Sequence, residues 1–203
     1  ILTRVDPLCQ KKYITFHAYC SSVLPLLESV PFILVYFCWN TRLFQKENYM
    51  VDADIIFKYF PNFNEKQVEQ ITKLFDLYQY HNARVNVISR KDMDNFYIHH
   101  VLHSLSLLNI ADFQHIKSVI DMGTGGGFPG IPLAIALPEI QFHLVDSIGK
   151  KIQVVNTIAS EIGLTNLRAS HSRVENIDEK FDMAVSRAVA PTKDLMNWMK
   201  SKW

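Results

Sequence analysis

The segment Asp121-Met-Gly-Thr-Gly-Gly-Gly-Phe-Pro-Gly130 decides the fold of this chain. It overlaps the end of Ser118–Met122, an apolar run typical of a buried strand, and it precedes an apolar segment, Ile131–Leu137. Pro132 suits the first turn of a helix there, because that turn needs no backbone N–H partner. Glycines let the backbone approach a ligand without Cβ clashes, so this turn between a strand and a helix predicts a ligand site.

The same alternation of strand and helix continues after this turn. Gln141–Asp146 predicts a second strand, and Lys150–Ile162 predicts a helix that Gly163 ends. Two further strands are expected at Leu167–His171 and Asp182–Ser186. Strands and helices that alternate with short loops indicate an α/β domain with a mainly parallel sheet, which binds ligands at the carboxyl ends of its strands.

The region before this domain has the periodicity of amphipathic helices. A short helix is expected at Asp52–Phe60, and a longer one at Glu65–Arg84. Asn64 and Gln67 have the spacing of a capping box at the start of the longer helix. Its apolar positions follow helical spacing and predict the buried face: Val68, Ile71, Leu74, Phe75 and Tyr78.

A third helix is expected to start at Asp92 as its N-cap. Its predicted inward positions are Ile98, Val101, Leu102, Leu105 and Leu108. Arg90 and Lys91 lie just before it, and we interpret them as candidate contacts to RNA phosphates, although a solvated loop would look the same. His99 and His103 have a spacing that could bind a metal, but no third ligand follows at a recognisable spacing, so no metal is expected.

Composition restricts the functional classes. The 203 residues carry 21 Lys and Arg against 20 Asp and Glu, so a net charge of +1 gives no global basic field and RNA contacts need a local patch. Hydrophobic residues at 48% and charged residues at 20% exclude a disordered or fibrous protein. The cysteines have no recognisable pairing pattern and indicate a reducing compartment, so we expect a cytoplasmic protein: Cys9, Cys20 and Cys38.

Residues 1–49 differ in their sequence pattern from the rest of the chain. Their apolar run Val23–Trp39 is interrupted by Pro25, Glu28 and Pro31, which argues against a membrane span. We interpret residues 1–49 as an apolar extension before a natural start at Met50, with an apolar subdomain as the alternative. Residues 50–112 are then a helical N-terminal cap, and residues 113–203 are the α/β domain.

Two ligands fit the glycine-rich turn. Gly125–Gly130 satisfies the dinucleotide pattern G-x-G-x-x-G, which favours NAD. Asp121, directly before the turn, suits the ammonium group of S-adenosylmethionine better than a pyrophosphate, and Asp121–Gly127 reads as Asp-x-Gly-x-Gly-x-Gly. Asp146 could bind ribose hydroxyls of either ligand. S-adenosylmethionine is therefore favoured, and a nicotinamide oxidoreductase remains the alternative.

Several segments resemble the bacterial small-subunit ribosomal RNA methyltransferase G family, also called glucose-inhibited division protein B. The resemblance covers residues 50 to the C-terminus, and its most specific block is Gly123–Ile135. The other similar segments are Leu144–Lys151, Asn86–Asp92, His100–Leu105, Ser172–Glu175 and Val185–Pro191.

The resemblance implies a Rossmann-like class I methyltransferase that transfers a methyl group from S-adenosylmethionine to N7 of one guanine in 16S ribosomal RNA. It implies a role at the active-site edge for Arg187, which would position RNA without acting as a base. The cofactor residues, from the motif and the resemblance together, are expected to be Asp121, Gly123, Gly125, Phe128, Asp146, Val174, Glu175 and Arg187. The expected partner is the small ribosomal subunit, and we expect a monomer.

The sequence departs from the family pattern at two places. His103 stands where many members have Asp, and the chain ends at Trp203, just after the fourth predicted strand. The family's sheet usually has seven strands, so the domain is expected to be truncated, with a central strand at an open edge. A cofactor- or RNA-binding fragment without turnover is therefore a third hypothesis.

Overall fold

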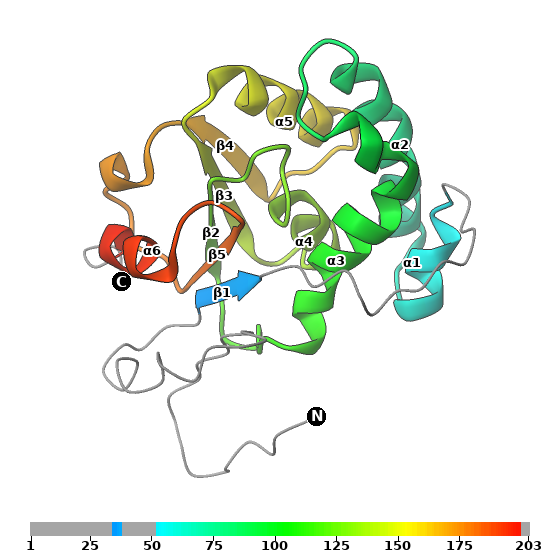
Figure 1. The fold of residues 1–203 in the computed structure, drawn as a ribbon. Helices are drawn as coiled ribbons and strands as arrows, with labels where there is room; N and C mark the ends of the chain where they lie inside the picture. The colour runs from blue at the N-terminus through cyan, green and yellow to red at the C-terminus, as the bar shows by residue number, and fades with distance from the viewer. Residues whose placement is uncertain (1–33, 38–51, 200–203) are drawn as a thin grey trace.

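The computed structural model of the chain describes residues 34–37 and 52–199. A five-stranded sheet forms its frame, and every described pairing in that sheet is parallel. The strands are β1 (Leu34–Phe37), β2 (Ser118–Met122), β3 (Gln141–Asp146), β4 (Leu167–His171) and β5 (Met183–Arg187). They lie in the order β1-β5-β2-β3-β4, as Figure 1 shows. When β2 is counted as the first strand, β4-β3-β2-β5 has the 3-2-1-4 order of a doubly wound sheet, whose ligand crevice lies between strands 1 and 4.

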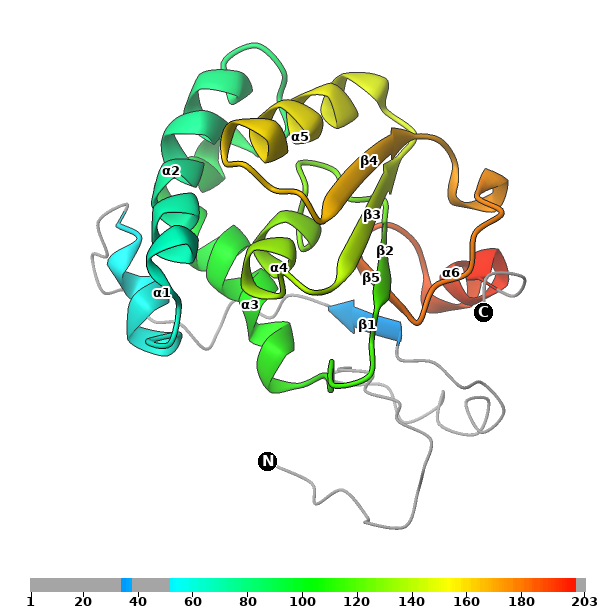
Figure 2. The ribbon, with the colours of Figure 1, turned by 180° about the vertical axis from the view of Figure 1, so that it is seen from behind.

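Helices cover both faces of this sheet. α4 and α5 pack on one face, with the helical N-terminal cap outside them, and α6 lies on the opposite face (Figures 1 and 2). The helices of the cap are α1 (Asp54–Tyr59), α2 (Glu65–Asn82), η3 (Arg90–Asn95), η4 (Tyr97–Leu102), α3 (His103–Leu105) and η5 (Ser106–Asn109). Those of the α/β domain are α4 (Gly130–Ala136), α5 (Gly149–Glu161), η6 (Val174–Asn176) and α6 (Thr192–Met199). The predicted α/β class and the N-terminal helical segment are confirmed.

The side chains of β2 alternate between two hydrophobic clusters. Val119 belongs to the cluster on the α4 and α5 side, whereas Ile120 and Met122 belong to the cluster that includes residues of α6. All three are fully buried, because a parallel sheet covered on both faces exposes neither. The alternation places Asp121 on the α4 side, directly under the glycine-rich turn.

α2 anchors the cap to the α/β domain. Its capping box is present as predicted: the Asn64 side chain accepts the backbone N–H of Gln67, and Gln67 accepts that of Asn64. The Gln67 side-chain amide also donates to the carbonyl of Ile135 in α4 at 2.9 Å, and that of Gln70 donates to Ile162 at the end of α5 at 2.8 Å. Polar residues at the start of α2 therefore fix its position against two helices of the sheet.

The prediction of one regular helix capped by Asp92 is wrong. A 3-10 helix already begins at Arg90, and it is followed by a π-helical stretch, one α turn and a second 3-10 turn. The Asp92 side chain makes no cap; its Oδ1 lies 2.9 Å from His99 Nδ1 instead. The apolar spacing was compatible with helix, but it could not distinguish the helix types.

Four residues from the predicted extension lie in the sheet. β1 pairs with β5 in the register from Leu34 opposite Ala184 to Phe37 opposite Arg187, and so covers the β5 edge that was expected to be open. The assignment of residues 1–49 to an extension did not anticipate this strand. The remainder of that segment, with its three cysteines, lies outside the described residues, as do residues 200–203. No helix within the described ranges is long and apolar enough to cross a bilayer.

Candidate functional site

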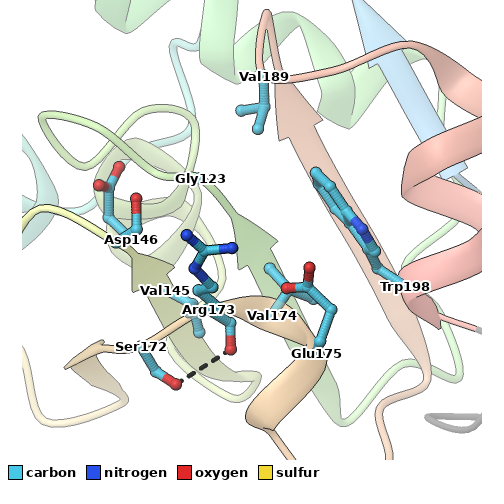
Figure 3. Close-up of a pocket in the computed structure, with 10 residues that line it drawn as sticks. Gly123, Val145, Asp146, Ser172, Arg173, Val174, Glu175, Val189 and Trp198 are labelled. Carbon is cyan, nitrogen blue, oxygen red and sulfur yellow. Dashed lines mark hydrogen bonds between the residues drawn. The ribbon is translucent and has the colours of Figure 1, made fainter.

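A pocket opens at the carboxyl ends of the central strands. It has a volume of about 160 Å³ and is open to solvent, and its walls come from the segments that follow β2, β3, β4 and β5 and from α6 (Figure 3). The lining residues are Gly123, Val145, Asp146, Ser147, Ser172, Arg173, Val174, Glu175, Val189 and Trp198. This is the position that the strand order predicts for a ligand.

Gly123 lines the pocket at a position that disfavours any side chain. Its φ is +68°, a left-handed conformation that costs other residues about 1–2 kcal/mol. A Cβ atom at this position would lie 2.4 Å from Cγ2 of Val189, which follows β5. The Gly123 N–H donates to the Val145 carbonyl at 2.8 Å, so the turn after β2 is held against β3.

Asp146, the last residue of β3, organises the turn from the other side. Its Oδ2 accepts the backbone N–H of Gly125 at 2.8 Å, and its Oδ1 accepts that of Ile148 at 2.8 Å. The side chain is buried to 8% exposure, yet it lines the pocket. Each carboxylate oxygen can accept more than one hydrogen bond, so Asp146 is oriented by the backbone and still has acceptor capacity for a ligand hydroxyl.

Asp121 lies beneath the turn and does not line this pocket. Its Oδ2 accepts the hydroxyl of Thr124 at 2.6 Å and the backbone N–H of Gly130, the first residue of α4, at 2.9 Å. Its Oδ1 has no hydrogen-bond partner among the described residues. Burial raises the pKa of Asp121 to about 6, despite these two hydrogen bonds and the nearby Arg187, which lower it. Asp121 therefore places a buried anionic group at the N-terminus of α4 at neutral pH.

An aromatic layer supports the glycine-rich turn. The Tyr78 hydroxyl donates to the carbonyl of Gly126 at 2.5 Å from a fully buried position in α2. Phe128 packs with its ring centroid 4.9 Å from that of Tyr78 and 5.1 Å from that of His100. The helical cap thus determines the path of the turn, although neither Tyr78 nor Phe128 lines the pocket.

Arg187 ends β5 and points into the same layer. Its Nη1 donates to the carbonyl of His99 at 3.2 Å, its Nη2 lies 3.0 Å from His100 Nδ1, and its Cζ lies 5.4 Å from the centroid of Phe128. Burial, and then the Arg187 charge, lower the pKa of His100 to about 4. His100 is therefore neutral at physiological pH, and its Nδ1 can accept the hydrogen bond from Arg187.

The cationic pair Arg90 and Lys91 is exposed in the first turn of η3. Asn82, at the end of α2, fixes the loop that carries the pair: its Oδ1 accepts the N–H groups of Val87 and Ile88, and its Nδ2 donates to the Ile88 carbonyl. The carbonyl of Val87 would lie 3.1 Å from a Cβ at Gly126, so this loop packs on the glycine-rich turn. The structure thus presents both cations on a fixed loop beside that turn.

The predicted cofactor residues divide into two groups. The pocket brings together Gly123, Asp146, Val174 and Glu175. The others lie behind it as support, without lining it: Asp121, Gly125, Phe128 and Arg187. Among the described residues, no group of three or more His, Cys, Asp or Glu is arranged to bind a metal ion.

Sequence reasoning missed part of the lining. Arg173 and Ser172 directly precede Val174 at the carboxyl end of β4, so the strand-end rule could have identified them. Val189 follows β5 and could have been found in the same way. Trp198 had no local signal, because it lies on α6 and reaches the pocket only through the packing of that helix.

The strand order and the position of this pocket define a Rossmann-like fold with a ligand site at the carboxyl ends of its strands. The chain belongs to the family described as GidB, rRNA small subunit methyltransferase G, whose sequence profile matches residues 67–203. Relatives in this family are named as methyltransferases of small-subunit ribosomal RNA.

Two curated relatives illustrate the similarity. A protein of Phocaeicola vulgatus named ribosomal RNA small subunit methyltransferase G is 55% identical over 143 residues, which cover 70% of this chain and 68% of that protein. Its namesake in Porphyromonas gingivalis is also 55% identical over 143 residues, covering 70% and 65%. The chain therefore spans about two thirds of the length of these relatives. A solved structure of ribosomal protein L11 methylase from Lactobacillus delbrueckii is 20% identical, with a TM-score of 0.41, over 49% of this chain and 51% of that one.

Proposed function

We propose that the pocket binds S-adenosylmethionine and that the chain transfers its methyl group to N7 of a guanine in 16S ribosomal RNA. The observation that carries the choice of cofactor is the hydrogen bond from the Gly130 N–H to Asp121. In dinucleotide-binding folds the pyrophosphate binds at this helix N-terminus. Here the Asp121 carboxylate already accepts the Gly130 N–H. It would repel the pyrophosphate of NAD, which disfavours that cofactor.

The other walls of the pocket match a nucleoside with a cationic tail. Asp146 offers acceptors for ribose hydroxyls at the end of β3, and Gly123 lines the pocket without a side chain. Val145 and Val174 are apolar and buried, and they suit a flat base. These residues therefore fit the cofactor, and Glu175 adds a polar group beside the nucleobase.

The reaction requires orientation more than acid–base chemistry. S-adenosylmethionine supplies an electrophilic methyl group on a sulfonium. Guanine N7 carries an unshared electron pair, so no proton has to be removed before attack. The task of the protein is then to hold the two reactants in line in a site with little water.

We assign Arg187 a positioning role in this task. Its hydrogen bonds to His99 and His100 connect the helical cap to the end of β5, beside the pocket. Neutral His100 accepts from the guanidinium, so Arg187 is held in one orientation beside the pocket. Arg187 acts as a fixed cation and not as a general base, because its guanidinium stays protonated.

RNA binding uses Arg90 and Lys91 on the fixed loop beside the glycine-rich turn. As phosphate contacts, these two cations add affinity without base specificity. Exchange of both residues for Ala is expected to weaken binding to 16S RNA and to reduce the slope of log affinity against log salt by roughly 2. The control is Lys117→Ala with Lys180→Ala, a pair of exposed lysines before β2 and β5, at the opposite ends of the strands. An equal loss in both double variants would contradict the assignment.

The cofactor proposal is tested by isothermal titration calorimetry of the whole chain with S-adenosylhomocysteine and, separately, with NAD. We expect micromolar binding of S-adenosylhomocysteine and none of NAD; the reverse result would support the oxidoreductase alternative. We further propose that the chain acts as a monomer in the bacterial cytoplasm, where its RNA substrate is found. Binding of cofactor and RNA without methylation would favour the fragment hypothesis.

A further inference from the structure

Among the described residues that line the pocket, Trp198 supplies the one aromatic side chain. It lies near the end of α6, on the face of that helix that also carries Leu195 and Met199, both fully buried against the second face of the sheet. These two residues fix the helix, so Trp198 is held at the pocket by the hydrophobic core. Figure 3 shows its indole on the side of the pocket where Val174 and Glu175 lie.

The chemistry of that end of the pocket is selective for a flat base. Val174 is buried to 7% exposure and offers an apolar surface, while the exposed Glu175 adds a carboxylate that can accept a hydrogen bond. An indole gives a broad π face, and stacking of a base on an aromatic side chain contributes substantially to affinity. A base with an exocyclic amino group could stack on the Trp198 indole, pack on Val174 and donate a hydrogen bond to Glu175.

We propose that Trp198 stacks on the adenine of the cofactor and, together with Val174, forms a wall of the adenine subsite. This inference rests on the proposed binding of S-adenosylmethionine. It gives α6 a direct role in cofactor binding, in addition to its role in covering the sheet.

The test uses Trp198 as its own reporter. Trp39→Phe with Trp203→Phe leaves Trp198 as the only tryptophan of the chain. In this background, S-adenosylhomocysteine and adenosine should both change the indole fluorescence, and the titration with S-adenosylhomocysteine should saturate at the calorimetric Kd. Methionine alone should have no effect, because it lacks the base.

Substitutions separate stacking from packing. Trp198→Leu keeps an apolar side chain without a ring and should weaken both S-adenosylhomocysteine and adenosine about tenfold, equivalent to ~1.4 kcal/mol. Trp198→Phe should recover most of this loss. Met196→Ala, on the same helix and packed on the same cluster, is the control and should leave both affinities unchanged.

The outcomes distinguish this inference from the function on which it rests. Calorimetric binding of S-adenosylhomocysteine without any fluorescence change, and with unaltered affinity in Trp198→Leu, would overturn the stacking and leave the proposed function standing. No calorimetric binding to the unsubstituted chain would overturn both.

Discussion

The carboxylate of Asp146 accepts the backbone N–H of Gly125 at 2.8 Å and so ties the end of β3 to the turn that follows β2. Its second oxygen binds the N–H of Ile148, at the start of the loop into α5. One side chain thereby fixes two of the segments that form the pocket. The shape of the pocket depends on this carboxylate before any ligand is bound.

Asp146→Asn should therefore damage the site. An amide offers one oxygen for two backbone donors, so one N–H faces another donor and loses its partner, at a cost of about 1–3 kcal/mol. We expect the affinity for S-adenosylhomocysteine to fall more than tenfold by calorimetry. Asp182→Asn is the control, because Asp182 accepts the N–H groups of Lys117 and Ser118 far from the pocket. Equal affinities in the two variants would contradict the role of Asp146.

Gly123→Ala should be costlier than Gly163→Ala. Both glycines have nearly the same φ, +68° and +67°, but a Cβ at Gly163 meets nothing within 4 Å. Gly163→Ala should therefore lower the free energy of unfolding by about 1 kcal/mol from backbone strain alone. Gly123→Ala adds the clash with Val189, which should cost roughly 1–3 kcal/mol more in urea unfolding.

A second substitution separates the two contributions. Val189→Ala in the Gly123→Ala background should remove most of the extra cost while the backbone strain remains. If Gly123→Ala proves no more destabilising than Gly163→Ala, the contact between Gly123 and Val189 is not the constraint inferred here.

Tyr78→Phe tests whether the helical cap shapes the turn. Removal of the hydroxyl leaves the carbonyl of Gly126 without its partner in a buried place, which should cost about 1–3 kcal/mol of unfolding free energy. We also expect weaker binding of S-adenosylhomocysteine, because the turn loses its support. Tyr97→Phe is the matched control, because the Tyr97 hydroxyl also donates to a backbone carbonyl, that of Thr72 within the cap. A decrease in affinity of the same size in Tyr97→Phe would argue against a specific effect of Tyr78.

Asp121 predicts a pH dependence of stability with a defined sign. Its pKa is near 3.9 in the unfolded chain and about 6 when buried, so the folded protein binds the proton more tightly. Ionisation therefore destabilises the fold progressively between about pH 4 and pH 6, by about 3 kcal/mol in total. Below this range the destabilisation is absent, and above it the full effect remains.

Asp121→Asn removes this ionisation. The difference in unfolding free energy between the variant and the parent should move in favour of the variant by about 2 kcal/mol as the pH rises from 4 to 7. The amide that this substitution introduces also makes less favourable contacts than the Asp121 carboxylate did. This cost does not depend on pH, so it cancels when the difference at one pH is compared with the difference at another. Urea unfolding at several pH values measures the change, and a constant difference would refute the raised pKa.

Local signals predicted most of the fold. The capping box at Asn64, the strands on either side of the glycine-rich turn, and the end of α5 at Gly163 depend on interactions within a few residues, and each was located from the sequence. β5 begins at Met183, one residue after the predicted start. Periodicity and capping are sufficient for such elements because their physical causes are local.

Long-range packing accounts for what the sequence did not reveal. The pairing of β1 with β5 and the approach of Trp198 to the pocket join segments far apart in the chain. The sequence also did not reveal that Asp121 accepts the backbone N–H of Gly130 under the turn, and its predicted role at the cofactor stays a prediction. A motif indicates that a carboxylate is needed at a position, whereas only the fold shows which groups it contacts.

Methyl transfer tests the central claim most directly. The whole chain is incubated with S-adenosylmethionine labelled in its methyl group and with small ribosomal subunits that lack the modification, and the digested RNA is analysed by mass spectrometry. We predict label in 7-methylguanosine from 16S RNA, with little in the Asp146→Asn variant. Label at another atom, or no label although S-adenosylhomocysteine binds, would contradict the proposed reaction.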